Sequence, residues 1–157
     1  MNFKEITISD IKKLADMYVA TFNSPPWNDE WTIETASKRL YQMVNCESSY
    51  GLVAYEDKLI CGMILGSEEQ YYNGIMFNIK EFCVRNDVRS KGLGTKIFQE
   101  FENRLKGKGI TEIILLTSKD DSTEGFYRKR GLQSYDEMVL MGKQIWLHSL
   151  NYTSIKT

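Results

Sequence analysis

Three apolar stretches in the middle of the chain follow one another with no helical pattern between them, and this order constrains the fold most. Residues 50–55 and 59–66 are separated only by the polar turn 56–58, which predicts a β-hairpin. Residues 75–84 form a third, longer strand, and we expect the polar residues 67–74 before it to form a loop. Strands joined by short connections pair antiparallel, so the centre of the chain predicts an antiparallel sheet.

Segments with helical periodicity precede and follow these three strands in the sequence. The order of elements along the chain is β-α-α-β-β-β-α-β-α-β, which predicts an α/β (α+β) fold with a mixed, mostly antiparallel sheet flanked by helices. The remaining elements are a strand at 3–8, helices at 11–22, 32–44, 92–106 and 122–130, and strands at 111–117 and 134–141. We expect one domain over residues 1–150 and a tail over 151–157.

Composition and charge exclude several functions. The 157 residues carry 20 Lys and Arg against 21 Asp and Glu, for a net charge of −1. This balance argues against a nucleic-acid binder, although the chain has a local basic group at Arg85, Arg89, Lys91 and Lys96. The one histidine and the lack of a CxxC pair argue against a metal site and against a Ser/His/Asp triad.

The cysteines and the N-terminus indicate a compartment. Cys46, Cys61 and Cys83 are odd in number and widely spaced, which is typical of reduced thiols rather than of a disulfide framework. The N-terminal residues lack the apolar core of a signal peptide, and no apolar run is long enough to cross a membrane. We therefore expect a cytoplasmic protein with no membrane contact.

The segment from Val84 to Thr95 carries the strongest chemical signal. A strand ends in the basic loop 85–91, and then Gly92 and Gly94 open an amphipathic helix. Glycines allow backbone N–H groups to approach a ligand, and a helix N-terminus has a positive potential that favours anions. The pattern predicts a phosphate cradle, although an ordinary helix start beside a solvated basic loop would look the same.

This cradle does not match the two commonest phosphate motifs. No GxxxxGK[ST] sequence is present, and Ile97 stands where a dinucleotide-binding fingerprint needs its third glycine. Instead Arg-x-x-Gly-x-Gly at 89–94 resembles the acetyl-CoA motif of the GCN5-related N-acetyltransferase (GNAT) superfamily. Residues 126–132 (FYRKRGL) are similar to the FYxKxGF segment of that superfamily, and the Met and Lys at 141 and 143 to its final strand.

The resemblance implies acetyl-CoA as the acetyl donor. Backbone groups of one strand would hold the pantetheine arm, where this strand splays from the strand at 113–117. The N–H groups at the helix start would hold the pyrophosphate. The implied cofactor-binding residues are Phe82, Cys83, Val84, Arg89, Ser90, Lys91, Gly92, Leu93, Gly94, Thr95, Asp120 and Phe126. Asp120 replaces the Asn that the family often has, and an ionised carboxylate can accept but not donate a hydrogen bond.

The resemblance also implies two catalytic residues. Tyr127 would protonate the departing thiolate of CoA, although a core tyrosine with its hydroxyl at the surface is the alternative. Glu81 is the candidate base that deprotonates the acceptor amine, either directly or through a water molecule. In a regular strand it shares a face with Phe77, Ile79 and Cys83, where burial would raise the pKa of its carboxyl. A β-bulge would break this parity, and an ordinary strand-edge carboxylate is the alternative.

Aromatic and acidic residues suggest the acceptor pocket. Trp27 and Trp31 lie in a stretch that is similar to the corresponding segment of aminoglycoside N-acetyltransferase-like small members of the superfamily. Glu69, Tyr71 and Tyr72 could form the opposite wall. Aromatic rings with carboxylates suit a cationic amine, although both tryptophans could simply anchor a loop in the core.

Two function classes follow from the resemblance. The first is an N-acetyltransferase that moves the acetyl group to a primary amine, preferably a small cationic one, by direct attack in a ternary complex. The second is a catalytically silent acyl-CoA-binding module or sensor with the same fold. A sheet of this kind often pairs across a two-fold axis, so we allow for a homodimer, whose interface nothing in the sequence fixes.

Overall fold

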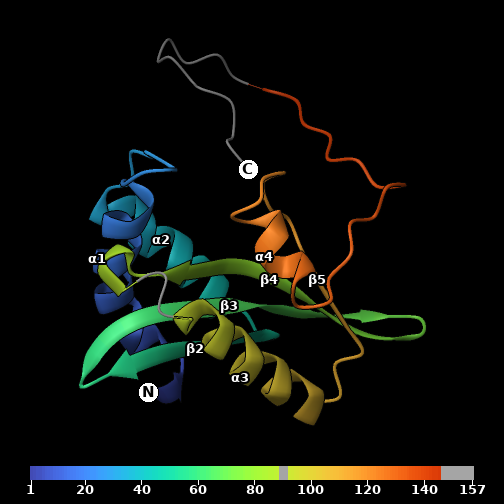
Figure 1. Cartoon of the computed structure of the whole chain (residues 1–157), viewed down its shortest axis with the longest axis horizontal. Helices are drawn as coiled ribbons and strands as arrows, with labels where there is room; N and C mark the ends of the chain where they lie inside the picture. Colours follow the sequence, from blue (N-terminus) through green and yellow to red (C-terminus); the bar gives the residue numbers. More distant parts are fainter. Residues whose placement is uncertain (89–91, 146–157) are drawn as a thin grey trace. The chain divides into compact units, whose positions relative to one another are not determined.

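The computed structural model describes residues 1–88 and 92–145. The chain divides into two units, Met1–Leu115 and Leu116–Thr157, and each is described by itself. The first unit contains β1 (Asn2–Glu5), η1 (Ile8–Asp10), α1 (Ile11–Phe22), α2 (Ile33–Val44), β2 (Ser49–Glu56), β3 (Leu59–Tyr71), β4 (Gly74–Val84), η2 (Asn86–Val88), α3 (Leu93–Gly107) and β5 (Glu112–Leu115) (Figure 1).

The five strands of the first unit form one sheet in the order β1-β2-β3-β4-β5. Every neighbouring pair is antiparallel except β4 and β5, which pair in parallel from Met76–Glu112 to Ile79–Leu115. The predicted fold class, a mixed and mostly antiparallel sheet flanked by helices, is therefore confirmed. The predicted β2–β3 hairpin is also confirmed, and its turn residues Asp57 and Lys58 have φ of 48° and 71°.

The expected loop at residues 67–74 is wrong. β3 continues through the polar residues to Tyr71, and β4 already begins at Gly74. Ser67 pairs with Asn78 and Tyr71 with Gly74, so a long hairpin replaces the loop. The end of β3 has polar side chains, so the sequence shows no apolar alternation there. The apolar residues of this hairpin lie on its partner strand, β4.

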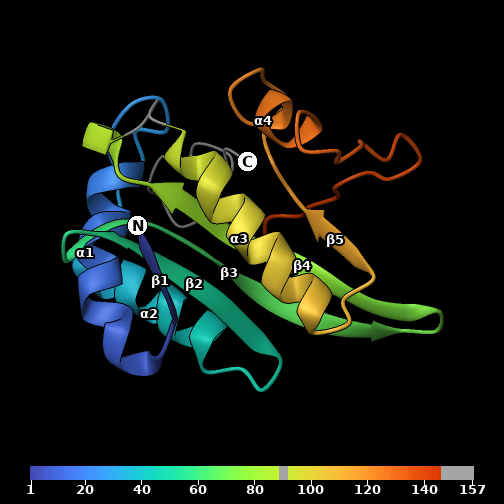
Figure 2. The ribbon, with the colours of Figure 1, turned by 60° about the horizontal axis from the view of Figure 1, so that its bottom comes forward.

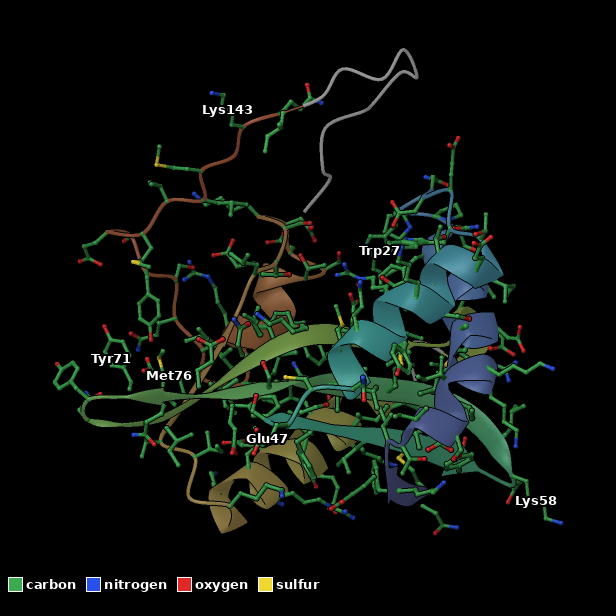
Figure 3. The ribbon with its side chains drawn as sticks, turned by 180° about the vertical axis from the view of Figure 1, so that it is seen from behind. Trp27, Glu47, Lys58, Tyr71, Met76 and Lys143 are labelled. Carbon is green, nitrogen blue, oxygen red and sulfur yellow. The ribbon has the colours of Figure 1, made fainter. Side chains whose placement is uncertain are left out.

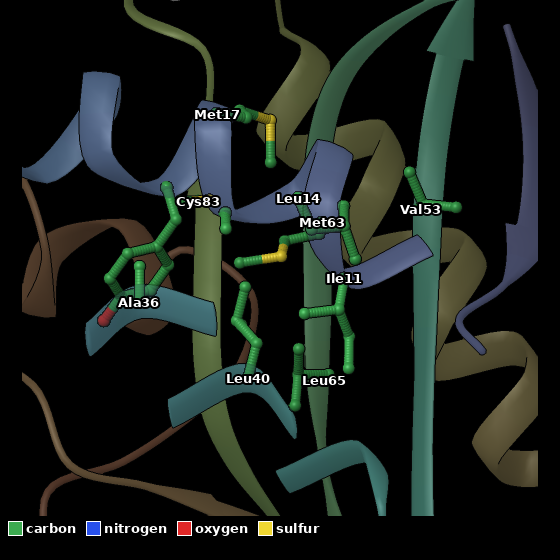
Figure 4. Packing of buried hydrophobic residues seen from close by; sticks show 11 residues of the cluster. Ile11, Leu14, Met17, Ala36, Leu40, Val53, Met63, Leu65 and Cys83 are labelled. Atoms are coloured by element: carbon green, nitrogen blue, oxygen red, sulfur yellow. The ribbon is translucent and has the colours of Figure 1, made fainter. Parts of the chain in front are cut away.

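Helices cover both faces of the sheet (Figure 2). On one face α1 and α2 pack on the strands, and on the other α3 places its apolar stripe against the sheet. The cluster beneath α1 and α2 consists of Ile11, Leu14, Ala15, Met17, Tyr18, Ala36, Leu40, Val53, Met63, Leu65 and Cys83 (Figure 4). Burial of these side chains is the main stabilising contribution to this layer.

β4 contains a β-bulge that changes which face its side chains occupy. Leu65 of β3 pairs with Glu81, but the next residue, Gly66, pairs with Ile79, so Lys80 is an extra residue in β4. Before the bulge, the Phe77 ring packs on Phe101 of α3, with centroids 5.3 Å apart. After the bulge, Glu81 contacts α1 and α2 instead.

Because of this bulge, Glu81 does not lie on the same face as Phe77, as a regular strand would have placed it. Glu81 and Cys83 lie on the face of α1 and α2, whereas Phe77 lies on the face of α3. Phe82 lies on the α3 face as well, because its ring is 6.4 Å from that of Phe98. The acidic side chain is buried as expected, but against other neighbours.

Within its described residues, 116–145, the second unit contains the short helix α4 (Glu124–Arg128). Gly131, with φ of 88°, follows this helix, and the Leu132 amide donates to the carbonyl of Tyr127 at 3.2 Å. This is the glycine-ended helix that the sequence predicts. Arg128 and Ser134 both hydrogen-bond to Glu124, at 2.6 and 2.7 Å, which links α4 to the segment that follows it.

The expected strand at residues 134–141 does not form. The segment is irregular, and the Met138 amide donates to the carbonyl of Tyr135 in a local turn at 3.2 Å. Its apolar side chains are exposed, Met141 by 85%. Alternation favours a strand only where a neighbouring strand takes up its backbone hydrogen bonds, and here a turn takes up one of them instead. The expected tail at 151–157 lies outside the described residues.

The described residues contain no helix with the length and apolar character needed to cross a membrane. No group of three or more His, Cys, Asp or Glu side chains in residues 1–88 and 92–145 is placed to hold a metal ion. All three cysteines are free thiols, with Cys61 and Cys83 buried and Cys46 exposed.

The bulge gives a stability prediction. A Cβ atom on Gly66 would lie 2.0 Å from the backbone oxygen of Asn78, where no flexible side chain can move aside. We expect Gly66→Ala to lower the free energy of unfolding by about 1–3 kcal/mol or more, measured by urea denaturation. The control is Gly107→Ala in α3, where nothing lies within 4 Å of the added atom. Equal stability of the two variants would contradict this account of the bulge.

Candidate active site

Glu81 of β4 is a buried acid of the first unit, and it is 7% exposed. Nε and Nη2 of Arg39 each lie 2.5 Å from its Oε1 atom. The Tyr18 hydroxyl donates to the same oxygen at 3.3 Å. Among the described residues these are the donors that Glu81 has, so Oε1 is saturated and Oε2 is left to accept a proton.

Aromatic and acidic side chains surround this carboxylate. The Tyr18 ring contacts the edge of Trp31, with centroids 5.2 Å apart, and the Arg39 guanidinium lies 5.6 Å from the Trp31 ring centre. Trp31 Nε1–H donates to Oδ2 of Asp29 at 3.0 Å. We call Tyr18, Asp29, Trp31, Arg39 and Glu81 the acidic–aromatic cluster.

Three elements position this cluster. Tyr18 lies on the buried face of α1, Arg39 lies on α2, and Glu81 follows the bulge of β4. In the loop between the helices, the Asn23 side chain accepts from the Trp31 amide and donates to the Trp31 carbonyl, each at 2.8 Å. This pair of bonds fixes the backbone of Trp31 where α2 begins.

Burial dominates the electrostatics of Glu81. Desolvation raises the pKa of its carboxyl, and the Arg39 guanidinium and the Tyr18 hydroxyl only partly offset this effect. Burial also raises the pKa of the Tyr18 phenol, and the neighbouring Glu81 charge raises it further. Tyr18 therefore stays protonated and acts as a donor.

The structure brings together some of the residues predicted for the acceptor pocket and separates others. Trp27 and Trp31 are half-buried in the loop between α1 and α2, and the Trp27 ring packs on Phe22 at 5.2 Å. Tyr71 and Tyr72 lie at the tip of the β3–β4 hairpin, where Tyr72 is 89% exposed. Figure 3 shows Tyr71 at this tip, on the other side of the view from Trp27.

The hairpin tip therefore does not form a wall opposite the tryptophans. Glu69 lies on the exposed part of β3, two residues before Tyr71. The anchoring contacts of the tryptophans are present, but Trp31 also faces the charged groups of the acidic–aromatic cluster.

The predicted cofactor residues of the first unit lie along the end of β4 and the start of α3. Phe82, Cys83 and Val84 end β4, beyond its parallel pairing with β5, which stops at Ile79. Gly92 caps α3 with φ of 72°, and nothing lies within 4 Å of the position of its missing Cβ. Leu93, Gly94 and Thr95 form the first turn of the helix, and Arg89, Ser90 and Lys91 lie outside the described residues.

The other predicted site residues belong to the second unit. Oδ1 of Asp120 accepts from the amides of Ser122 and Thr123 at 2.8 and 2.9 Å, just before α4. Hydrogen bonds from Ser122 and then Thr123 lower the pKa of the Asp120 carboxyl. This carboxylate therefore caps the turn before the helix as an acceptor.

Phe126 and Tyr127 lie on α4, and both are half-buried. The guanidinium of Arg130 lies 3.3 Å from the centre of the Phe126 ring. The roles of Phe126 in binding the cofactor and of Tyr127 in catalysis stay predictions.

Reasoning from the sequence missed Tyr18 and Arg39. Tyr18 was visible only as one position of the apolar stripe of α1, and Arg39 as a charged residue of α2. Arg39 lies 42 positions before Glu81, so no local spacing connects them. The signal that could have raised the question was the acid itself, because a buried carboxylate requires a partner.

The comparisons with known proteins decide the family. A family model described as an acetyltransferase (GNAT) domain matches residues 13–148. The chain belongs to the GNAT family. The resemblance of the chain to this family is thereby confirmed, and the protein is an acetyl-transferring enzyme.

Solved structures agree on the fold. A possible acetyltransferase from Clostridium difficile 630 has a TM-score of 0.78 at 16% identity, over 92% of this chain and 98% of that one. An aminoglycoside acetyltransferase from an uncultured soil metagenomic sample, in complex with trehalose, has a TM-score of 0.71 at 18% identity. The match covers 92% of this chain and 96% of that one.

A predicted acetyltransferase from Clostridium acetobutylicum, solved with acetyl-CoA, has a TM-score of 0.69 at 18% identity, over 90% of this chain and 95% of that one. No curated protein matches the chain in sequence. At these identities the structural likeness shows the GNAT fold alone.

The burial of Glu81 in this GNAT protein gives a prediction on pH. The pKa of Glu81 is higher in the folded protein than in the unfolded chain. Folding therefore takes up a proton at pH values between these two pKa values. Its contribution to stability is therefore full below the unfolded pKa and is lost as the pH rises through the folded one. We expect the free energy of unfolding of the wild type, minus that of Glu81→Gln, to fall as the pH rises above 4.5, the ordinary pKa of this carboxyl.

Urea denaturation at several pH values would measure this difference. The control is Glu68→Gln, which makes the same substitution on the exposed part of β3. A flat difference for Glu81→Gln would show that the fold does not perturb this carboxyl.

Proposed function

We propose that the protein transfers the acetyl group of acetyl-CoA to the primary amine of a small cationic molecule, by direct attack in a ternary complex. The observation that carries this proposal is the buried Glu81 carboxylate, held on Oε1 beside an aromatic ring and a second acid. Such a group both attracts a cation and can take up its proton.

The charges of the acidic–aromatic cluster support a cationic acceptor. Glu81 and Asp29 supply two carboxylates, and Arg39 supplies one guanidinium. One negative charge is therefore unmatched within the cluster, and an ammonium group would match it. One of the structures with the same fold is an aminoglycoside acetyltransferase, and this likeness fits the proposal.

The residues present also fit acetyl-CoA. Gly92 adopts a left-handed conformation with open space where a side chain would stand, at the N-terminus of the long helix α3. A helix N-terminus of this kind favours the charge of a pyrophosphate, and Arg89 and Lys91 would add positive charge. Backbone groups at the end of β4 would hold the pantetheine arm. When bound, acetyl-CoA would supply the acetyl group as an activated thioester.

The residues of the chain would manage the protons. Glu81 takes one proton from the acceptor ammonium and passes it to solvent, which frees the nitrogen lone pair to form the new C–N bond. As the C–S bond breaks, the Tyr127 hydroxyl gives its proton to the sulfur, and the second proton lost by the nitrogen restores the phenol. The products are an acetamide and free CoA thiol.

We place this activity in the cytoplasm, because the chain has three free cysteines and reducing compartments keep thiols free. The acceptor is a small molecule in this proposal, with no role for nucleic acid. A homodimer stays a prediction.

The donor is tested first by thermal shift. We expect acetyl-CoA to raise the melting temperature in a saturable way, since a ligand at 100 times its Kd stabilises the folded state by about 2.7 kcal/mol. 3′-Dephospho-CoA, which keeps the pyrophosphate, should also stabilise, whereas acetyl-pantetheine, which lacks it, should have little effect. No shift at millimolar acetyl-CoA would overturn the cradle at residues 89–95.

Tyr127 separates turnover from binding alone. We expect Tyr127→Phe to lower the rate of thiol release with an amine panel by about 10²–10⁴-fold, because general acid catalysis contributes this much, while acetyl-CoA still gives its thermal shift. Tyr135→Phe, on an exposed tyrosine of the same unit, is the matched control and should keep full activity. An unchanged rate in Tyr127→Phe would remove this phenol from the mechanism.

A further inference from the structure

We propose that Arg39 is a positioning residue for Glu81: it orients the carboxylate so that Oε2 receives the proton of the acceptor amine, and it keeps the carboxylate ionised in its buried site. This inference rests on the proposed role of Glu81 as the base. It assigns to α2 a part in the reaction that neither the family motifs nor the sequence pattern indicates.

The geometry of the ion pair is the first step of the argument. Arg39 uses two nitrogens, Nε and Nη2, on the single oxygen Oε1, each at 2.5 Å. The Tyr18 hydroxyl approaches the same oxygen from α1 at 3.3 Å. Donors that converge on one oxygen fix the rotation of the carboxylate and leave the other oxygen as the basic one.

The guanidinium is itself held in place. Its carbon lies 5.6 Å from the Trp31 ring centre, and Trp31 is fixed by Asn23 and Asp29. Helix α2 starts just after Trp31 with a capping box, in which the Thr35 amide donates to Oγ1 of Thr32 at 3.1 Å. Arg39 therefore stands on a helix whose first turn is fixed beside the same tryptophan that its guanidinium faces.

The charges around Glu81 show what Arg39 changes. Tyr18 faces the carboxylate from α1, Arg39 faces it from α2, and Cys83 lies two residues along β4. Asp29, in the loop, disfavours the charged form of Glu81, as does burial. Arg39 is the one cation among these groups, so it supplies the positive charge that keeps Glu81 ionised.

The half-exposed position of Arg39 suits a positioning role. Its side chain is 41% exposed, whereas that of Glu81 is 7% exposed, so the pair lies where the core meets the surface. An acceptor that reaches Oε2 would not have to displace the guanidinium from Oε1. The alternative is that Arg39 competes with the cationic acceptor for Glu81. In that case the removal of Arg39 would raise kcat/KM for the amine rather than lower it.

The test compares Arg39→Gln, Arg39→Lys and a control, Lys38→Gln. The control removes an exposed charge from the preceding position of the same helix. We expect Arg39→Gln to move the acid limb of the kcat/KM profile to higher pH, so that kcat/KM at a fixed pH on this limb falls about tenfold for each pH unit of the shift. Arg39→Lys should restore part of this loss, and Lys38→Gln should keep the wild-type profile.

A second measurement needs no activity. The titration of the Glu81 carboxyl, followed by ¹³C NMR and assigned by its absence in Glu81→Gln, should move to higher pH in Arg39→Gln and stay near the wild-type midpoint in Lys38→Gln. If no amine is acetylated by the wild type, the proposed function fails, and this titration still decides whether Arg39 controls the charge of Glu81. Arg39→Lys serves as the folded variant if the loss of the cation unfolds Arg39→Gln.

Two results would overturn the proposal. One is a Glu81 titration that is the same in wild type, Arg39→Lys and Arg39→Gln. The other is a rise in kcat/KM for the amine in Arg39→Gln, which would show that the guanidinium competes with the acceptor.

Discussion

The extra residue in β4 is the constraint on which the rest of the first unit depends. Lys80 lies opposite no residue of β3, so the side chains after it change face. Phe77, before the bulge, belongs to the layer of α3, and Glu81, after it, belongs to the layer of α1 and α2. The parallel pairing with β5 stops at Ile79, next to this bulge, although β4 continues to Val84. One inserted residue thus separates a strand segment that builds the core from one that carries the candidate chemistry.

A buried acid after the bulge then couples the site to the packing of two helices. A buried carboxylate without a partner would cost several kcal/mol, so Glu81 is compatible with the fold only because α1 and α2 bring Tyr18 and Arg39 to it. The same helices bury Leu14 and Leu40 in the cluster beneath them. Burial therefore holds these helices against the sheet, and their position supplies the donors. A change that shifts either helix would alter both the stability and the charge state of Glu81.

Local signals in the sequence predicted most helices and strands. Features that depend on pairing between residues distant in the sequence could not be predicted from it. The turn at Asp57 and Lys58 and the apolar stripe of α3 are local, and both are present. The bulge depends on how β3 pairs with β4, so the sequence allowed for a bulge in this strand without fixing its position. The polar end of β3 and the segment at 134–141 were misjudged because side-chain alternation does not say whether a partner strand is present. The family motifs identified the candidate cofactor residues, but those motifs contain no information about Arg39, which contributes through its contact with Glu81.

The charge of the acidic–aromatic cluster connects recognition of the acceptor with removal of its proton. With Glu81 and Asp29 ionised, the cluster holds one negative charge beyond the charge of Arg39, and a cationic amine is attracted to it. Transfer of a proton from that amine to Glu81 leaves a neutral nucleophile beside Asp29 and Arg39, whose charges balance. The low dielectric around Glu81 favours this redistribution, because burial raises the pKa of its carboxyl, while Arg39 partly offsets that rise and so favours the ionised form before the acceptor arrives. Burial and the guanidinium therefore act in opposite directions on one carboxyl, and a base near neutral pH requires both.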